Sequence, residues 1–343
     1  MACACFFFAG FLSEAEAPSH HTPEGFRNNY PQEPQASFLA WKWEQLRNGT
    51  PAPPPGGWNI PFVKADAAAL RANTTQPTVT WIGHAGFLIR LAGRNVLTDP
   101  HFSQRASPVQ FAGPKRIVAL PIEIAELPHI DVVTISHNHY DHLDLDSVKR
   151  LAAQPGGSPL FVVPLGLKSW FVAQGLDRVE ERDWWASITD GPLTFTLVPG
   201  QHWSKRTFFD TNQSLWGGWI IAGDGLKILH TGDLGYSKDS KDVGDRAGPF
   251  DLALIPIGAY APRWFMKGMH INPAEAVQVR SDLRARRAIA MHWGTFENLT
   301  DEPLDEPPRI LAEKRAEAGL SAEDFDVMKV GETRPITRGG GRP

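Results

Sequence analysis

Residues 127–142 read LPHIDVVTISHNHYDH and carry three histidines and one aspartate within six positions. The run Val132–Ile135 is apolar and mostly β-branched, which is typical of a strand buried on both faces. The polar residues begin where this strand ends, and side chains at strand ends converge at one rim of an α/β sheet. Imidazole and carboxylate groups bind divalent metals, so the stretch predicts a metal site. The alternative is a polar, solvated loop.

The donor types favour a hydrolytic zinc ion over a structural one, because structural zinc sites usually contain thiolates. Cys3 and Cys5 are the only cysteines, and both lie far from the histidine cluster in sequence. Four donors in one loop are more than a single tetrahedral ion can accept, so we expect two metal ions. Manganese and iron remain alternatives to zinc, because histidine and aspartate accept both.

Two metal ions need further ligands, and three other donors lie just beyond predicted strands. They are His202 after residues 193–198, Asp233 after residues 227–229 and His292 after residues 288–291. Each alone could be an ordinary strand-end turn residue. Together with the first cluster they predict a dinuclear centre at the rim of a sheet.

Residues 137–142 match the pattern His-x-His-x-Asp-His, and in this the chain resembles the metallo-β-lactamase superfamily. The resemblance implies an α/β fold, the αβ/βα four-layer sandwich, with the metals at the rim between two sheets. The implied ligand set has one zinc held by His137, His139 and His202, the other held by Asp141, His142 and His292, and Asp233 bridging them.

A narrower resemblance, to the N-acylphosphatidylethanolamine-hydrolysing phospholipase D family, runs from about Phe26 to Gly331. The segments that support it are 201–207, 214–217, 248–252, 254–267, 290–296 and 322–325. Residues 232–236 read Gly-Asp-Leu-Gly-Tyr where the family usually has Gly-Asp-Thr-Gly-Tyr. The membrane-contacting N-terminal segment of animal members has no clear counterpart here.

This resemblance implies hydrolysis of N-acylphosphatidylethanolamine to phosphatidic acid and N-acylethanolamine. A metal-bridging hydroxide would attack phosphorus, since metal coordination lowers the pKa of water towards about 7. The implied partner is a phospholipid, with peripheral contact to a membrane. A second hypothesis is that the same metals hydrolyse a lactone or a sugar phosphate ester, because a fold does not fix a substrate. A third is a zinc-binding or redox scaffold without activity.

Two residues are predicted to act in catalysis. Asp141 could orient the hydroxide through its second oxygen. His270, just before a helix predicted to start near Pro273, could assist the leaving alkoxide, or could merely support the turn. Asp99 could hold a ligand histidine in its tautomer or form an Asx turn. His84 is predicted to be a buried structural residue near the site, and so is His230.

Four residues near His270 are predicted to bind substrate: Tyr260, Arg263, Trp264 and Met269. With Phe265 and Met266, the aromatic and thioether side chains could line an acyl-chain groove. Arg263, Lys267 and Arg206 could neutralise a phosphate. The alternatives are ordinary core for the apolar side chains and solvated surface for the cations.

Composition excludes several other classes of protein. The chain has 343 residues, 42% of them hydrophobic, which suffices for a large core. The net charge of −4 gives no general attraction to nucleic acid. No apolar run approaches the roughly 18 residues that span a bilayer. These features predict a cytoplasmic protein, peripheral to the membrane if it binds one.

The chain divides into four predicted parts. Residues 1–17 are an apolar stretch that is expected to be disordered; the alternative is an export signal or lipid anchor, although the stretch lacks the basic start of a secretory signal. Residues 18–77 form a Pro-rich arm with one short helix near 38–46, which packs on the main domain through its tryptophans or joins a homodimer contact. Residues 78–335 form the hydrolase domain, with helices near 145–153, 167–174, 274–283 and 309–319. Residues 336–343 are expected to be a flexible tail.

Overall fold

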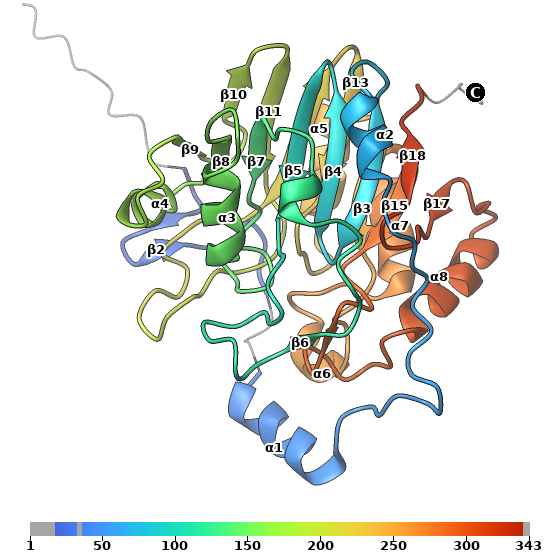
Figure 1. Ribbon diagram of the computed structural model, residues 1–343. Helices are drawn as coiled ribbons and strands as arrows, with labels where there is room; N and C mark the ends of the chain where they lie inside the picture. Colours follow the sequence, from blue (N-terminus) through green and yellow to red (C-terminus); the bar gives the residue numbers. More distant parts are fainter. Residues whose placement is uncertain (1–17, 33–35, 339–343) are drawn as a thin grey trace, which may run out of the picture.

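Apolar, β-branched runs separated by tight turns form two seven-stranded sheets that pack face to face (Figure 1). The computed structural model describes residues 18–32 and 36–338. The predicted disordered stretch 1–17 lies outside these residues. Both sheets have the same plan, in which antiparallel hairpins are followed by parallel strands.

The first sheet has the order β18-β3-β4-β5-β7-β8-β9. Its strands are β3 (Thr78–Gly83), β4 (Gly86–Leu91), β5 (Arg94–Thr98), β7 (Val132–Thr134), β8 (Leu160–Pro164), β9 (Val179–Arg182) and β18 (Thr333–Pro335). The second sheet has the order β10-β11-β12-β13-β14-β15-β17. Its strands are β10 (Ser187–Asp190), β11 (Leu193–Val198), β12 (Gly218–Gly223), β13 (Leu226–His230), β14 (Phe250–Pro256), β15 (Ala285–Met291) and β17 (Phe325–Asp326).

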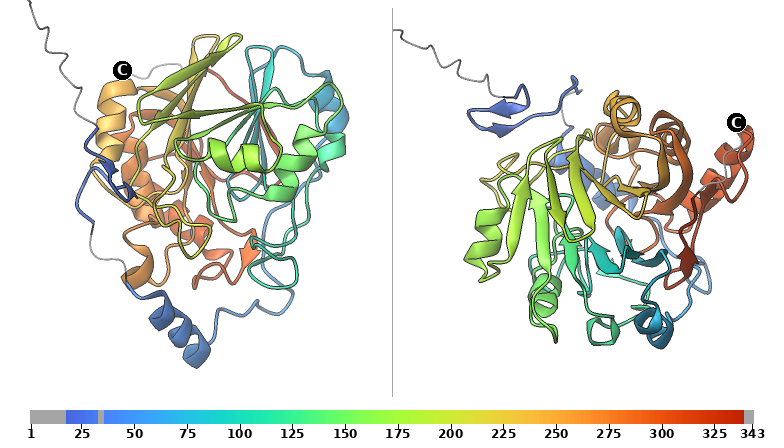
Figure 2. Two further views of the ribbon diagram at one scale, coloured as in Figure 1. Left: turned by 90° about the vertical axis from the view of Figure 1, so that its left-hand side faces the viewer. Right: turned by 90° about the horizontal axis from the view of Figure 1, so that it is seen from above.

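Helices cover the outer face of each sheet, which makes four layers (Figure 2). On the first sheet they are α2 (Ala67–Ala72), α3 (Leu145–Ala152) and α4 (Lys168–Ala173), and on the second α5 (Asp239–Ala247), α7 (Pro273–Asp282) and α8 (Glu306–Glu317). The remaining elements are β1 (His21–Thr22), β2 (Gly25–Phe26), α1 (Phe38–Asn48), β6 (Lys115–Arg116), η1 (Ile124–Glu126), α6 (Arg263–Met266) and β16 (Phe296–Glu297). The predicted αβ/βα sandwich is confirmed.

Helix starts follow the local sequence. Asn272 caps α7, and its side chain and that of Glu275 form a capping box around Pro273 in the first turn. The last helix, α8, begins at Glu306, three residues before its predicted start. Prolines fit its first turn because the N–H groups there need no helical partner.

The parallel strands place polar residues on one rim. Strands β5 and β7 run parallel to each other in the first sheet, and β13 and β15 both run parallel to β14 in the second, so within each sheet their carboxyl ends point the same way. The chain leaves each of these ends through a short loop that carries the residues of the predicted metal site. Trp219, fully buried between the sheets, donates its indole N–H to the Ile135 carbonyl at 2.7 Å. The core thus fixes the start of the histidine loop.

The arm contacts the main domain through some of its predicted anchors. On α1, Trp41 is buried, stacks on Phe265 with ring centroids 4.8 Å apart and donates to Asp301. Trp43 is 61% exposed, so the expectation that it packs is wrong; it lies on the other side of the same short helix. The prediction of one helix in the arm is also wrong. The arm contains a second helix, α2, which Asp66 caps.

The prediction that a flexible tail begins at residue 336 is wrong for residues 336–338, which contact the main domain. Ile336 is buried, and its N–H donates to the Pro77 carbonyl at 2.9 Å. Arg338 donates to the Asp224 carbonyl at 2.7 Å. Residues 339–343 lie outside the described part. Across residues 18–32 and 36–338, no helix is long and apolar enough to cross a membrane.

Candidate metal centre

Three predicted ligands form a first group of nitrogen donors. His137 Nε2 lies 2.8 Å from His139 Nδ1, which lies 3.3 Å from His202 Nε2. Burial lowers the pKa of all three imidazoles, to about 3 for His139 and about 4 for His202. Neutral imidazole is the form that binds metals, so the group is ready to accept an ion.

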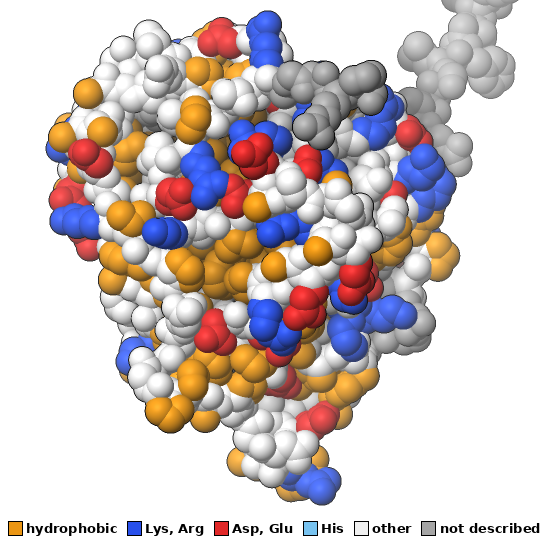
Figure 3. Space-filling model, turned by 90° about the vertical axis from the view of Figure 1, so that its right-hand side faces the viewer, with side chains coloured by type: hydrophobic (Ala, Val, Ile, Leu, Met, Phe, Trp, Pro, Cys, Tyr) orange, Lys and Arg blue, Asp and Glu red, His pale blue; other side chains and the backbone are white. Residues whose placement is uncertain are grey.

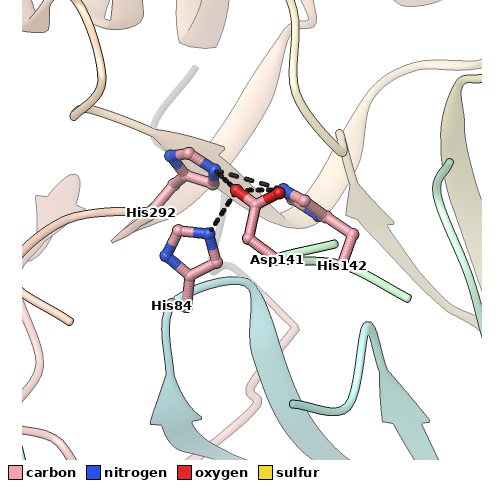
Figure 4. Close-up of side chains that lie close together, drawn as sticks. All are labelled: His84, Asp141, His142 and His292. Atoms are coloured by element: carbon pink, nitrogen blue, oxygen red, sulfur yellow. Dashed lines mark hydrogen bonds and ion pairs between the residues drawn. The ribbon is translucent and has the colours of Figure 1, made fainter. Parts of the chain in front are cut away.

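A second group lies beside the first and includes three further predicted ligands (Figure 4). The Nε2 atoms of His142 and His292 are 3.1 Å apart. Asp141 Oδ2 lies 3.6 Å from His142 Nε2 and 3.4 Å from His292 Nε2. These donors come from the loops after β7 and β15, which share the rim.

Asp233 lies between the two groups. Its Oδ2 is 3.0 Å from His142 Nε2 and 3.1 Å from His292 Nε2 in the second group. The same oxygen is 3.9 Å from His137 Nε2 and 4.0 Å from His202 Nε2 in the first. Neither oxygen of this buried carboxylate has a hydrogen-bond partner among the described residues. This position suits a bridging ligand.

The chemistry of the cluster fits two divalent cations. Ligand atoms around a tetrahedral zinc with bonds of about 2.1 Å are roughly 3.4 Å apart, close to most donor separations here. The carboxylates of Asp141 and Asp233 also need positive charge nearby to offset their own negative charge. Burial would lower the pKa of His142 and His292, but the facing carboxylates outweigh it and raise both, that of His292 to about 9. Bound cations would take the place of those protons.

His84 is a member of the cluster that the sequence did not reveal as one. Its Nε2 lies 3.1 Å from Asp141 Oδ2, and its ring is 3.9 Å from that of His292 (Figure 4). Burial lowers the pKa of His84 to about 3, so the neutral ring can donate its N–H to Asp141. In the sequence, His84 directly follows β3, as the predicted ligands follow their strands, and this position could have identified it.

Asp99 and His230 are the other buried polar residues of interest. Asp99 Oδ2 lies 2.7 Å from His142 Nδ1, and its carboxylate also accepts from the backbone and hydroxyl of Ser136. This contact supports the hypothesis that Asp99 orients a ligand imidazole, as carboxylates often do at metal sites. His230 lies 2.9 Å from the Ala85 carbonyl and is buried, consistent with a structural role.

His270 faces the cluster from the segment between α6 and α7. Its Nδ1 is 3.9 Å from Asp233 Oδ2, and that nitrogen is buried with no hydrogen-bond partner among the described residues. Burial lowers the pKa of His270 to about 3. A neutral imidazole with a free position next to the ligands can donate or accept one proton there.

An apolar cavity of about 790 Å³ opens onto the ligands. His139, Asp141, Asp233, His270 and His292 form its polar end. Its apolar walls include Phe38, Trp41, Trp203, Phe208, Phe265, Met266, Met269 and Leu299, and Lys42, Lys205 and Arg206 also line it. Met269 lies in this wall, and its contact with substrate stays a prediction.

The other three predicted substrate contacts do not line this cavity, which corrects the prediction. Tyr260 donates its hydroxyl to Glu306 at 2.6 Å. Arg263 pairs with Glu275 at 2.8 Å and donates to the His270 carbonyl, so it supports that loop. Trp264 is half-exposed and donates to Glu44. Arg263 and Trp264 lie on the short helix α6, and their partners Glu275 and Glu44 hold them outside this cavity.

Arg206 does line the cavity, but its charge is already engaged. The guanidinium donates to the carbonyls of Asn138 and Leu143 and lies 4.1 Å from the centroid of the Tyr140 ring. Arg206 therefore braces the histidine loop, and phosphate is not its first partner.

Known proteins share this sequence and fold. Residues 94–293 match the family model of the beta-lactamase superfamily domain. The chain is 43% identical over 264 residues to N-acyl-phosphatidylethanolamine-hydrolyzing phospholipase D 1 of Caenorhabditis elegans, covering 74% of each protein. It is 40% identical to the mitochondrial enzyme of that name in Saccharomyces cerevisiae, covering 74% of this chain and 55% of the yeast protein.

Among solved structures, an isothiocyanate hydrolase from Delia radicum gut bacteria superposes with a TM-score of 0.60 at 19% identity, over 76% of this chain and 99% of that one. At that identity the superposition shows the fold alone. The sequence matches go further. The chain is a metal-dependent hydrolase of the metallo-β-lactamase superfamily and belongs to its family of N-acylphosphatidylethanolamine-hydrolysing phospholipases D.

Proposed function

We propose that this protein is a dinuclear zinc phosphodiesterase that hydrolyses N-acylphosphatidylethanolamine to phosphatidic acid and N-acylethanolamine. The observation that carries the proposal is the cavity of about 790 Å³, whose apolar walls lead to the ligand cluster. Such walls suit acyl chains, whereas a sugar phosphate would need polar partners along its length. The family relationship to enzymes named for this lipid supports the same substrate.

When bound, the two metal ions would supply Lewis acidity and a water deprotonated near neutral pH. The chain's own residues then set the geometry. Burial opposes ionisation of Asp141, but the surrounding imidazoles hold its pKa well below the usual range, so it remains a carboxylate that can orient a water. His84, whose Nε2 lies 3.1 Å from Asp141 Oδ2, would hold this carboxylate in place.

The cavity also offers partners for a phosphate group. Lys42 and Lys205 line it and carry positive charge. Trp203 packs on His139, and its indole N–H is buried with no hydrogen-bond partner among the described residues. A buried indole N–H normally has an acceptor, and a phosphate oxygen would provide one.

The decisive experiment supplies the zinc-loaded protein with N-acylphosphatidylethanolamine in mixed micelles, with a simple lactone and with a sugar phosphate, in water enriched in ¹⁸O. We expect phosphatidic acid containing one ¹⁸O and unlabelled N-acylethanolamine, because water adds to phosphorus and the bond to the ethanolamide oxygen breaks. Loading with manganese or iron in parallel identifies the preferred metal. Turnover of the lactone or sugar phosphate without release of phosphatidic acid would refute the lipid proposal.

We further propose that the mouth of this cavity rests on a lipid surface. Phe38 and Phe208 line the cavity yet are largely exposed, and Phe209 beside them is 88% exposed. Leu39 and Trp43 on α1 are exposed as well. Figure 3 shows hydrophobic side chains around the lower end of the molecule, where α1 protrudes. Exposed apolar groups gathered around a lipid-sized cavity are typical of an interfacial surface.

Replacing both aromatic residues of the loop, Phe208→Ser with Phe209→Ser, is expected to weaken binding to phospholipid vesicles by about tenfold or more, because each buried Phe contributes roughly 1.5–3 kcal/mol. Vesicle cosedimentation measures this directly. Hydrolysis of a short-chain, monomeric substrate should change far less. The matched control is Val172→Ser, an exposed apolar residue on α4. Equal vesicle binding by the double variant and the wild type would contradict the proposal.

A further inference from the structure

The N-terminal arm reaches the metal centre through one side chain, that of Asn28. Its Nδ2 donates to the His202 carbonyl at 2.9 Å, and its Oδ1 accepts from the His202 N–H at 3.1 Å. The same amide donates to Gln32 Oε1 at 2.9 Å and accepts from Trp216 Nε1 at 3.3 Å. A carboxamide has two donor hydrogens and two acceptor lone pairs, so its full capacity is used.

The two bonds to His202 resemble the pairing of neighbouring strands, in which one residue exchanges both backbone bonds with one partner. His202 lies beyond the end of β11, so no regular ladder fixes its backbone. It is also fully buried, where an unpaired N–H or C=O is costly. Asn28 therefore satisfies and fixes the backbone of a metal ligand.

The imidazole of His202 is oriented by a separate contact. Its Nδ1 lies 2.9 Å from the Met269 carbonyl, which leaves Nε2 to face His139 and Asp233. The ring contact sets the tautomer and the rotation of the imidazole. The contact with Asn28 fixes the backbone from which the His202 side chain extends. Together the two contacts fix the position of Nε2.

Contacts on both sides of Asn28 hold the arm in place. Towards the N-terminus, the Nε2 atoms of His20 and His21 lie 2.6 and 2.8 Å from the two oxygens of Asp183. Towards the C-terminus, Asn29 donates to Asp239 at 2.8 Å. The arm is thus anchored to the main domain on each side of the contact with His202.

We propose that Asn28 is a positioning residue for the His202 ligand, which makes the N-terminal arm a structural part of the metal centre. The inference rests on the metal-binding part of the proposed function and not on the lipid substrate. It assigns the arm a role in metal retention, in addition to any contact it makes with a membrane or a second subunit.

The test compares Asn28→Ala and Asn28→Asp with Asn29→Ala in the full-length, zinc-loaded protein. The aspartate variant keeps the shape and an acceptor for the His202 N–H but loses the donor to the His202 carbonyl. We expect both Asn28 variants to lose zinc to a competing chelator at about tenfold lower chelator concentration, because partners of ligand residues typically contribute 10- to 100-fold in metal affinity. Asn29→Ala, which removes a neighbouring contact of the arm, should stay within twofold of the wild type.

Two further measurements separate positioning from general damage. The visible spectrum of the cobalt-substituted protein should change in the Asn28 variants and not in Asn29→Ala, since it reports ligand geometry. Melting temperatures of the metal-free proteins show whether the variants fold; if Asn28→Ala does not, the isosteric aspartate variant decides. Unchanged zinc retention in Asn28→Asp, or an equal loss in Asn29→Ala, would overturn the proposal. No lipid is present, so the outcome is independent of the substrate.

Discussion

The Asp233→Asn variant is expected to lose at least one of two bound metal ions and about 10³-fold of the hydrolytic activity. Asp233 Oδ2 is the atom that lies within 4.0 Å of histidine nitrogens from both groups. The amide keeps the shape but removes the charge that offsets two cations. Breaking a buried charge pair costs about 3–5 kcal/mol, and each 1.36 kcal/mol changes a rate or equilibrium about tenfold.

Metal content by mass spectrometry and kcat/KM on the micellar substrate measure the two effects. The control is Asp245→Asn, an exposed carboxylate on α5 that pairs with Lys241. It should behave as the wild type. Full metal content together with near-normal activity in Asp233→Asn would show that this carboxylate does not bridge the ions.

The second large effect is expected from His270→Ala, with kcat about 10²-fold lower or more and with metal content unchanged. The ring lines the cavity 3.9 Å from Asp233 and has a free nitrogen, so it can pass a proton to the departing ethanolamide oxygen. Positioned proton transfer contributes about 10²- to 10⁴-fold. Burial lowers the pKa of His270, so the ring is neutral and would act as a relay: it gives its N–H proton to the departing oxygen while its other nitrogen takes a proton from water.

A second substrate tests this assignment. A p-nitrophenyl phosphodiester releases an anion that needs no proton, so the defect of His270→Ala should shrink to severalfold on it. His129→Ala provides the control, because the ring of this exposed histidine lies 3.1 Å from the Pro155 carbonyl and does not line the cavity. An equal defect on both substrates would exclude a role towards the leaving group, and a fall in metal content would make His270 a ligand.

The residues of the candidate metal centre could be picked out because their positions follow from local sequence. An apolar strand followed within four residues by histidine or aspartate recurs after β7, β11, β13 and β15, and strand ends converge wherever the strands share a rim. The same signal was present at His84, but a single histidine after one strand also fits a buried structural residue. Its contact with Asp141 joins residues 57 apart in sequence.

The substrate contacts could not be predicted in this way. Tyr260, Arg263 and Trp264 are close to His270 in sequence, and this nearness suggested a shared cavity. In the structure, Arg263 instead turns to Glu275 and Tyr260 to Glu306. Those partners lie on α7 and at the start of α8, and nothing in the sequence around Arg263 indicates them.

The sequence by itself determined the fold and predicted the donor residues that the structure brings together, because strand periodicity and the His-x-His-x-Asp-His spacing act within a few residues. Only the tertiary structure decided which side chains face the cavity and which hold the ligands. The contact between Asn28 and His202 spans 174 positions. Packing of the arm and the sheets creates it, and packing depends on distant residues that no local pattern encodes.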